Sequence, residues 1–374
     1  MAQDDGQFTR AATWAILAIA VGAGVGPALQ PLLLGALLKA GRLDAAALGH
    51  AAMIESLGMA VASTIATFAL RPNRLRWLTG GALLATFVAA AGTMMGQGVG
   101  ILWARGLNGV ANGVLLWLLV GMITRSRAPA QVFAYYITGQ SIAAFALSAL
   151  FARIILPASG ANAAYLVLLA VNIALLLVAM PFVPRAFSAH AGGGVDAGQP
   201  GDDDGPAAST ALPMPPPLGW LALLGVGAQI AAVMAFWVYA VPLAMQAGIT
   251  QGAANDIISL ANAGLIVAGL AACATAARFR PVPVIIITAL VSIGALAVTG
   301  NSANATMWTA ALFLFAFAWT YAPPFHMTYL LQADQSGRAA MLVSPAQLLG
   351  MAAGPMLAAT AVRDGDFTGA RTIA

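Results

Sequence analysis

The sequence has few charged residues, which make up only 7% of its 374 positions. A soluble domain carries about a quarter of charged residues, so this composition excludes an ordinary soluble globular protein. The chain has one cysteine, Cys273, which excludes an intrachain disulfide. Only three histidines occur, at scattered positions.

Catalytic and nucleotide-binding motifs are also missing. The sequence contains no Gly-x-Ser-x-Gly, no His-Glu-x-x-His and no glycine-rich phosphate loop followed by Lys-Ser or Lys-Thr. We therefore expect no enzymatic activity, no cofactor, no metal and no nucleic-acid partner. Without a nucleotide-binding loop, any work by this protein draws on an ion gradient or on a solute's own gradient.

Hydrophobic residues, by contrast, make up 61% of the chain and gather in long runs. A helix needs about 20 apolar residues to cross the bilayer core. The first run is too long for the apolar part of a cleaved signal, so it is interpreted as a retained span. Eleven spans are predicted: Thr13–Leu38, Ala46–Leu70, Leu75–Met95, Val99–Thr124, Gln131–Leu156, Asn162–Val183, Leu218–Met245, Asp256–Ala277, Val282–Thr299, Thr306–Leu331 and Ala339–Val362.

The spans divide into two groups. Residues 1–184 hold six spans, and residues 218–374 hold five. Between them, residues 185–217 are rich in Gly, Pro, Ala and Asp, a composition that cannot bury enough apolar surface to fold. The prediction is an all-α membrane protein with two helix bundles joined by a flexible linker.

Basic residues indicate the orientation, because they are more frequent in cytoplasmic loops. With the N-terminus inside, the outer segments hold Lys39, Arg42, Arg153, Arg363 and Arg371. The inner segments then hold Arg10, Arg71, Arg74, Arg76, Arg125, Arg127, Arg185, Arg278, Arg280 and Arg338. A cytoplasmic N-terminus and linker are therefore predicted. High Ala and Gly content with a single lysine is typical of GC-rich bacterial genomes, which indicates an inner (cytoplasmic) membrane.

Several short motifs accompany this arrangement of spans. In "WARGLNGVANG" of the fourth span, Arg105 is followed by Gly109 and Gly113. The loop "LRPNRLR" carries Arg71 and Arg74 between spans two and three. The loop "ADQSGR" follows span ten, and "GMAAGP" lies on span eleven. With six spans, a linker and a second set of spans, the chain resembles the major facilitator superfamily of secondary transporters.

The resemblance implies two pseudo-symmetric bundles that expose a central cavity to each side in turn. It also implies gating loops, which here hold Arg71, Arg74, Asp334 and Arg338. In the loop signature, Leu70 replaces the aspartate and Asn73 replaces the glycine of the family. A twelfth span is missing, and a truncated chain is favoured over a natural eleven-span protein.

Helices one, four, seven and ten line the cavity in that family. The residues that would line it here are Gln30, Asn108, Asn112, Gln229, Trp237, Trp319 and His326. Pro323 and Pro324 predict a break in span ten. For His326, a hydrogen-bonded histidine near the inner helix end is the favoured alternative. The polar residues that open span eight, Asn255 to Asn262, are interpreted as a solvated helix end.

Two charged residues are expected deep in the membrane. From the predicted span starts, Glu55 lies roughly 14 Å and Arg105 roughly 9 Å below the outer surface. A charge near the bilayer centre needs a partner or a wet cavity. Glu55 and Arg105 are therefore predicted to form a buried pair, or to share a proton, facing a central cavity, where the carboxyl would change its protonation as the cavity opens to each side. The alternatives are a static pair that fixes helix packing, or an arginine whose head reaches the outer surface.

Taken with the resemblance, these features predict a monomeric, proton-coupled carrier of a small organic solute in the lipid bilayer. The alternatives are a membrane receptor or sensor that does not transport, and a multidrug-type efflux carrier. Against the receptor stands the lack of a folded signalling domain in the termini or linker. The absence of a Gly-Pro element from span five disfavours the drug carrier.

Overall fold

The computed structural model describes residues 8–70, 74–123, 129–186, 214–276, 278–334, 339, 342–363 and 365–374. Within these ranges the regular structure is helical, apart from one bridge between Arg363 and Asp366. The predicted all-α class is confirmed. The first half contains α1 (Arg10–Gly24), α2 (Gly26–Lys39), α3 (Ala45–Ala69), α4 (Leu75–Met95), α5 (Val99–Ile123), α6 (Pro129–Leu150), the π-helical η1 (Phe151–Ile155), α7 (Leu156–Ala174), the π-helical η2 (Leu175–Ala179) and the 3₁₀ turn η3 (Met180–Phe182).

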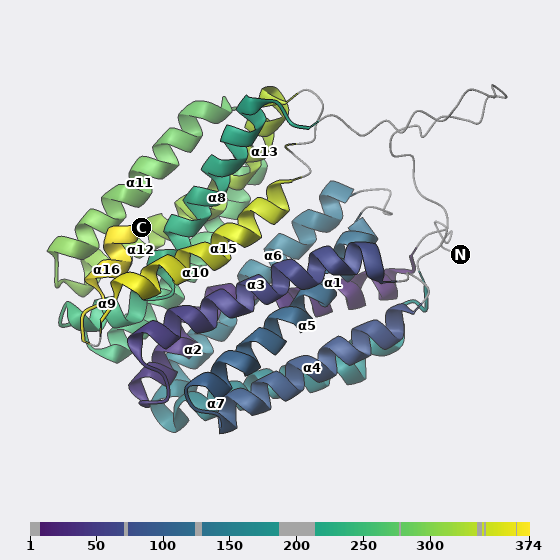
Figure 1. Cartoon of the computed structure of the whole chain (residues 1–374), viewed down its shortest axis with the longest axis horizontal. Coiled ribbons are helices and arrows are strands. Elements are labelled where there is room, and N and C mark those ends of the chain that lie inside the picture. The colour runs from purple at the N-terminus through teal and green to yellow at the C-terminus, as the bar shows by residue number, and fades with distance from the viewer. Residues whose placement is uncertain are drawn as a thin grey trace.

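The second half has the same all-helical character. It contains α8 (Pro217–Trp237), α9 (Ala240–Gln246), α10 (Gln251–Thr275), α11 (Pro281–Asn301), α12 (Ala305–Tyr321), α13 (Pro323–Ala333), α15 (Val343–Ala361) and α16 (Thr368–Ile373). The axes of the long helices in both halves are roughly parallel to one another (Figure 1). Helix α3 of the first half lies beside α15 of the second. The predicted linker, 185–217, lies largely outside the described residues.

Nine stretches of the described residues are long and apolar enough to cross a membrane. The stretch Tyr135–Phe182 spans 48 residues, more than twice the length that one crossing requires. It is interrupted at Gly160, whose φ of 70° is not helical, and it covers most of the predicted spans five and six. The chain is a multi-pass membrane protein, whereas the division into six and five spans stays a prediction.

Among the described residues, the buried apolar cluster that joins the two halves lies at one end of the molecule. We call this end, which holds residues 39–45, 155–161 and 246–251, the closed end. There, Leu37 and Leu48 belong to the same buried cluster as Val241 and Ile257. At the opposite end, two further clusters form, one from the first half alone and one from the second half alone. In the described residues the halves are thus packed together at one end.

Three of the membrane helices are broken. Span ten divides at Ala322, between α12 and α13, where Pro323 and Pro324 predict a break. Span seven divides at Val238 and Tyr239, between α8 and α9. The first span also divides, at Val25 between α1 and α2, and sequence reasoning missed this break although Gly26 and Pro27 follow it.

Candidate functional site

Glycines bring α3 and α5 into backbone contact. A Cβ atom added at Gly109 would overlap the carbonyl oxygen of Glu55, and one added at Gly113 would overlap that of Met59. On the facing helix, a Cβ at Gly58 would lie 2.9 Å from the Gly106 oxygen. Small residues allow this close approach of membrane helices. The contact places Glu55 of α3 directly against α5, one turn from Arg105.

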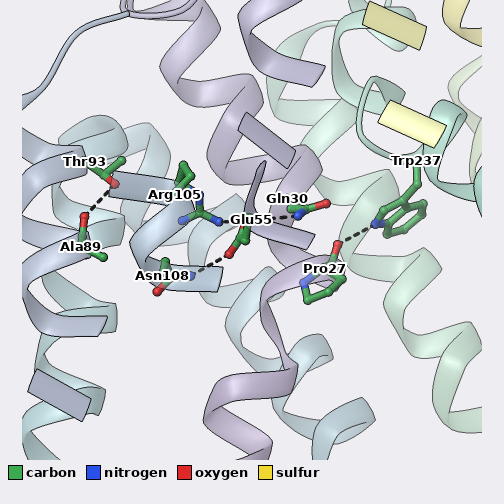
Figure 2. A network of polar contacts seen from close by, with 8 residues as sticks. All are labelled: Pro27, Gln30, Glu55, Ala89, Thr93, Arg105, Asn108 and Trp237. Carbon is green, nitrogen blue, oxygen red and sulfur yellow. Dashed lines mark hydrogen bonds and ion pairs between the residues drawn. The ribbon is translucent and has the colours of Figure 1, made fainter. Parts of the chain in front are cut away.

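The Glu55 carboxylate is the centre of a buried polar network (Figure 2). Arg105 of α5 forms an ion pair with it through Nη2 and Oε2. Asn108 Nδ2 donates to Oε1 at 2.6 Å, and Gln30 Nε2 of α2 donates to Oε2 at 3.2 Å. Glu55 is 1% exposed and Arg105 4% exposed. Helices α5 and α2 thus supply the carboxylate of α3 with a full positive charge and two amide donors.

Arg105 itself is not fully satisfied. Its Nε is buried without a hydrogen-bond partner, and so is the hydroxyl of Tyr165. A buried ion pair is stable only when its partners and hydrogen bonds are in place. The predicted juxtaposition of Glu55 and Arg105 is present in the structure, with Gln30 and Asn108 as additional partners.

The break in the first span creates a second polar contact. Pro31 lies inside α2, and its ring nitrogen cannot donate to the carbonyl of Pro27 four residues earlier. The indole Nε1 of Trp237, from α8 in the other half, donates to that carbonyl at 3.1 Å (Figure 2). Trp237 is fully buried. A carbonyl freed by proline is therefore satisfied from the opposite half of the molecule.

Two amide side chains contact neighbouring carbonyls of the same broken helix. Asn262 Nδ2 of α10 donates to the Ala28 oxygen at 3.4 Å, and Gln140 Nε2 of α6 donates to the Gly24 oxygen at 2.5 Å. The expectation of a solvated polar face on span eight was wrong, because Asn255 and Asn262 are buried. This face packs against the first half, whose helices sequence reasoning could not place beside it.

Removal of the Trp237 donor should weaken the closed end. In Trp237→Phe a smaller aromatic ring remains, but the Pro27 carbonyl loses its partner, which costs about 1–3 kcal/mol. We expect the arrangement in which the halves separate at this end to gain population by about fivefold or more. Spin labels at Ser159 and Met245, exposed residues at the closed end of either half, should report a longer mean distance.

A matched control is Trp308→Phe. Trp308 is equally buried, but its indole donates at 2.7 Å to Ser302, within the second half. This variant should lose stability without changing the label distance. Equal distance distributions in both variants would contradict a role for Trp237 in joining the halves.

The other predicted cavity residues fall in different places. Trp319 packs edge-on against Trp237, with ring centroids 5.8 Å apart, and Asn112 is buried on α5. Gln229 and His326 line a cavity of about 510 Å³ between α8, α11 and α13. His326 is 4% exposed, and its Nδ1 has no hydrogen-bond partner among the described residues. The predicted set therefore divides between the Glu55 network, the tryptophan pair and a separate cavity within the second half.

Only part of the predicted gating loops is visible. Arg71 and Arg338 lie outside the described residues. Arg74 is exposed at the start of α4. Asp334 is buried, and its Oδ2 accepts a hydrogen bond of 2.8 Å from the Ala339 amide. That contact lies within the second half.

The fold is shared with solved transporters at low sequence identity. The xylose transporter XylE from E. coli superposes with a TM-score of 0.68 at 10% identity, over 97% of this chain and 94% of that one. For the nucleoside transporter NupG the TM-score is 0.65 at 12% identity, over 96% and 94%. For the human organic anion transporter MFSD10 it is 0.63 at 16% identity, over 97% of both chains.

No protein-family model matches the chain, and no curated protein matches it by sequence. The structural comparisons establish the fold, which is that of major facilitator-type transporters. The resemblance inferred from the arrangement of spans and from the fourth-span motif is confirmed at the level of that fold.

Proposed function

We propose that the protein is a secondary transporter that couples the movement of a small organic solute to protons, with Glu55 as the protonation site. The observation that supports this most is the buried carboxylate held between Arg105, Gln30 and Asn108. Ionisable groups inside the membrane are costly and usually serve function. The solved transporters that share the fold make a carrier the most direct assignment.

A physical link connects this carboxylate to the movement of the halves. Gln30, which donates to Glu55, lies on the same turns of α2 as Pro27 and Ala28. These two residues accept hydrogen bonds from the second half. Separation of the halves at the closed end would break both bonds and release this segment of α2. Glu55 would then lose a donor and gain access to water, through which a proton would reach its carboxylate.

The distribution of basic residues supports a proposal for the orientation, and the groups near the junction of the halves support one for the solute. We propose an inner-membrane monomer whose N-terminus is cytoplasmic, so that the closed end faces outward. One arginine, several amides and the Trp237–Trp319 pair lie near the junction of the halves. Such groups fit a neutral, aromatic or weakly anionic solute better than a multiply charged one.

The test is proton movement in inside-out vesicles that contain the protein. The vesicles are energised and then challenged with a panel of neutral, aromatic and weakly anionic solutes. At least one solute should dissipate the proton gradient in a saturable way, and vesicles without the protein should not respond. If every solute leaves the gradient unchanged while solute counterflow proceeds, the protein is a uniporter and the proposed coupling is wrong. If neither flux nor counterflow occurs, the transporter assignment is wrong.

A further inference from the structure

A second pocket lies at the closed end, between the two halves. It has a volume of about 430 Å³ and is lined by the C-terminal end of α2, the start of α7 and the first turns of α10. The first half supplies Lys39, and the second half supplies Gln251 and Asn255. The remaining lining is small or apolar, with Ala36, Pro157 and Ala161 as examples. This volume is in the range of small-molecule sites.

Two acceptor atoms of this pocket lack partners. The side-chain oxygens of Gln251 and Asn255 are both buried without a hydrogen bond. Asn255 is only 3% exposed. Buried polar atoms are nearly always hydrogen-bonded, and an unsatisfied pair in one cavity therefore indicates a missing donor. The two residues lie four positions apart on α10, so they face the same side of the helix.

Lys39 supplies an uncompensated positive charge to the same pocket. The neighbouring Arg42 is engaged with the Gly96 carbonyl and with Asn162, and Arg153 is paired with Asp256 at 3.0 Å. Among the described residues, Lys39 has no carboxylate partner. Lys39 is exposed at the edge of the pocket, where an ammonium group without a counter-ion attracts an anion.

We propose that this pocket binds a small hydroxy acid. Its carboxylate would pair with the Lys39 ammonium, and its hydroxyl groups would donate to the Gln251 and Asn255 oxygens. Because the walls come from both halves, the bound molecule would add a bridge between them and favour the closed arrangement of this end. This site is distinct from the Glu55 network and does not rest on the proposed transport function.

The test uses gluconate as probe, with two six-carbon compounds that each lack one of its features. Sorbitol has the hydroxyl groups without the carboxylate, and hexanoate has the carboxylate without the hydroxyl groups. Binding is measured by calorimetry on the purified full chain in detergent, so that transport is not required. Gluconate should bind at least about tenfold more tightly than either compound, because sorbitol lacks the charge-assisted hydrogen bond to Lys39 and hexanoate lacks the hydroxyl hydrogen bonds to the two amide oxygens.

Variants assign the binding to this pocket. Lys39→Gln should reduce the affinity for gluconate to that for sorbitol, whereas Arg280→Gln, which removes an exposed charge far from the pocket, should leave it unchanged. Asn255→Leu should reduce it toward that for hexanoate. If Asn255→Leu fails to fold, Gln251→Leu serves as the second variant, because Gln251 is half-exposed. It should reduce the affinity for gluconate in the same way.

Two results would overturn the proposal. One is gluconate binding no tighter than that of sorbitol and hexanoate in the wild-type chain, including no binding at all. The other is tight gluconate binding that persists in Lys39→Gln, which would place the molecule elsewhere in the protein.

Discussion

Replacement of Glu55 by glutamine should remove the pH dependence of transport while solute exchange continues. Glutamine keeps the shape of the side chain and one acceptor oxygen, replaces the other oxygen with an NH₂ donor, and cannot take up a proton in the relevant pH range. Proton-driven accumulation should fall by at least about tenfold, since the proposed coupling has no other buried carboxylate near Arg105 among the described residues. Exchange of labelled for unlabelled solute should remain measurable at all pH values.

Loss of one charge of a buried pair can also destabilise the fold, by about 3–5 kcal/mol, because the other charge is left uncompensated. The double variant Glu55→Gln with Arg105→Gln removes both charges and should recover folded protein. It should still lack coupling. This pair of variants separates a failure of folding from a failure of proton transfer.

Asp256→Asn is the matched control for the loss of an acid. Asp256 pairs with Arg153, but the two side chains are 43% and 64% exposed. An exposed pair contributes about 0.2–1 kcal/mol, and the variant should keep both stability and pH dependence. If Glu55→Gln retains the pH dependence of the wild type, Glu55 is a structural residue and the static-pair alternative is correct.

A methyl group at Gly109 should separate α3 from α5 and disrupt the first half. In Gly109→Ala the new Cβ would overlap the carbonyl oxygen, the carbonyl carbon and the Cα of Glu55. These are backbone atoms, which cannot move aside as a flexible side chain can. Overpacking of this kind costs about 1–3 kcal/mol, and occasionally more. We expect a lower yield of monodisperse protein and a lower Tm.

The control lies on the same helix. Gly100→Ala adds its methyl group where no atom lies within 4 Å. Alanine also has the higher helix propensity, by about 1 kcal/mol, so this variant should be at least as stable as the wild type. Equal Tm values for the two variants, measured in the same detergent, would contradict the close packing of α3 and α5.

The overall arrangement was accessible from the sequence because the membrane restricts the choices. Long apolar runs can only be spanning helices, and a charge within them needs a partner. Counting residues from the predicted span starts placed Glu55 and Arg105 at similar depths. The structure places them in an ion pair. Their role in coupling stays a proposal.

Contacts between the halves were not accessible in the same way. Nothing in the local sequence of α10 shows that Asn262 meets the Ala28 carbonyl, since that depends on how two bundles dock. The break at Val25 did have a signal in Gly26 and Pro27, but proline near a helix start is compatible with an unbroken helix. Gln229 and His326 were expected in the central cavity because they lie on spans seven and ten. In the structure they line a cavity together with α11 instead.

The hydrogen bond between Trp237 and the Pro27 carbonyl has a consequence for how mutations at distant positions depend on one another. Its acceptor is free because Pro31 lacks an N–H, and not because of the side chain at position 27. Any other residue at position 31 would offer its own amide to that carbonyl. The stabilisation that Trp237 contributes through this hydrogen bond therefore depends on the proline at position 31, although the two side chains need not be in contact. Two such positions would vary together through a shared backbone atom, a form of epistasis that a map of side-chain contacts does not reveal.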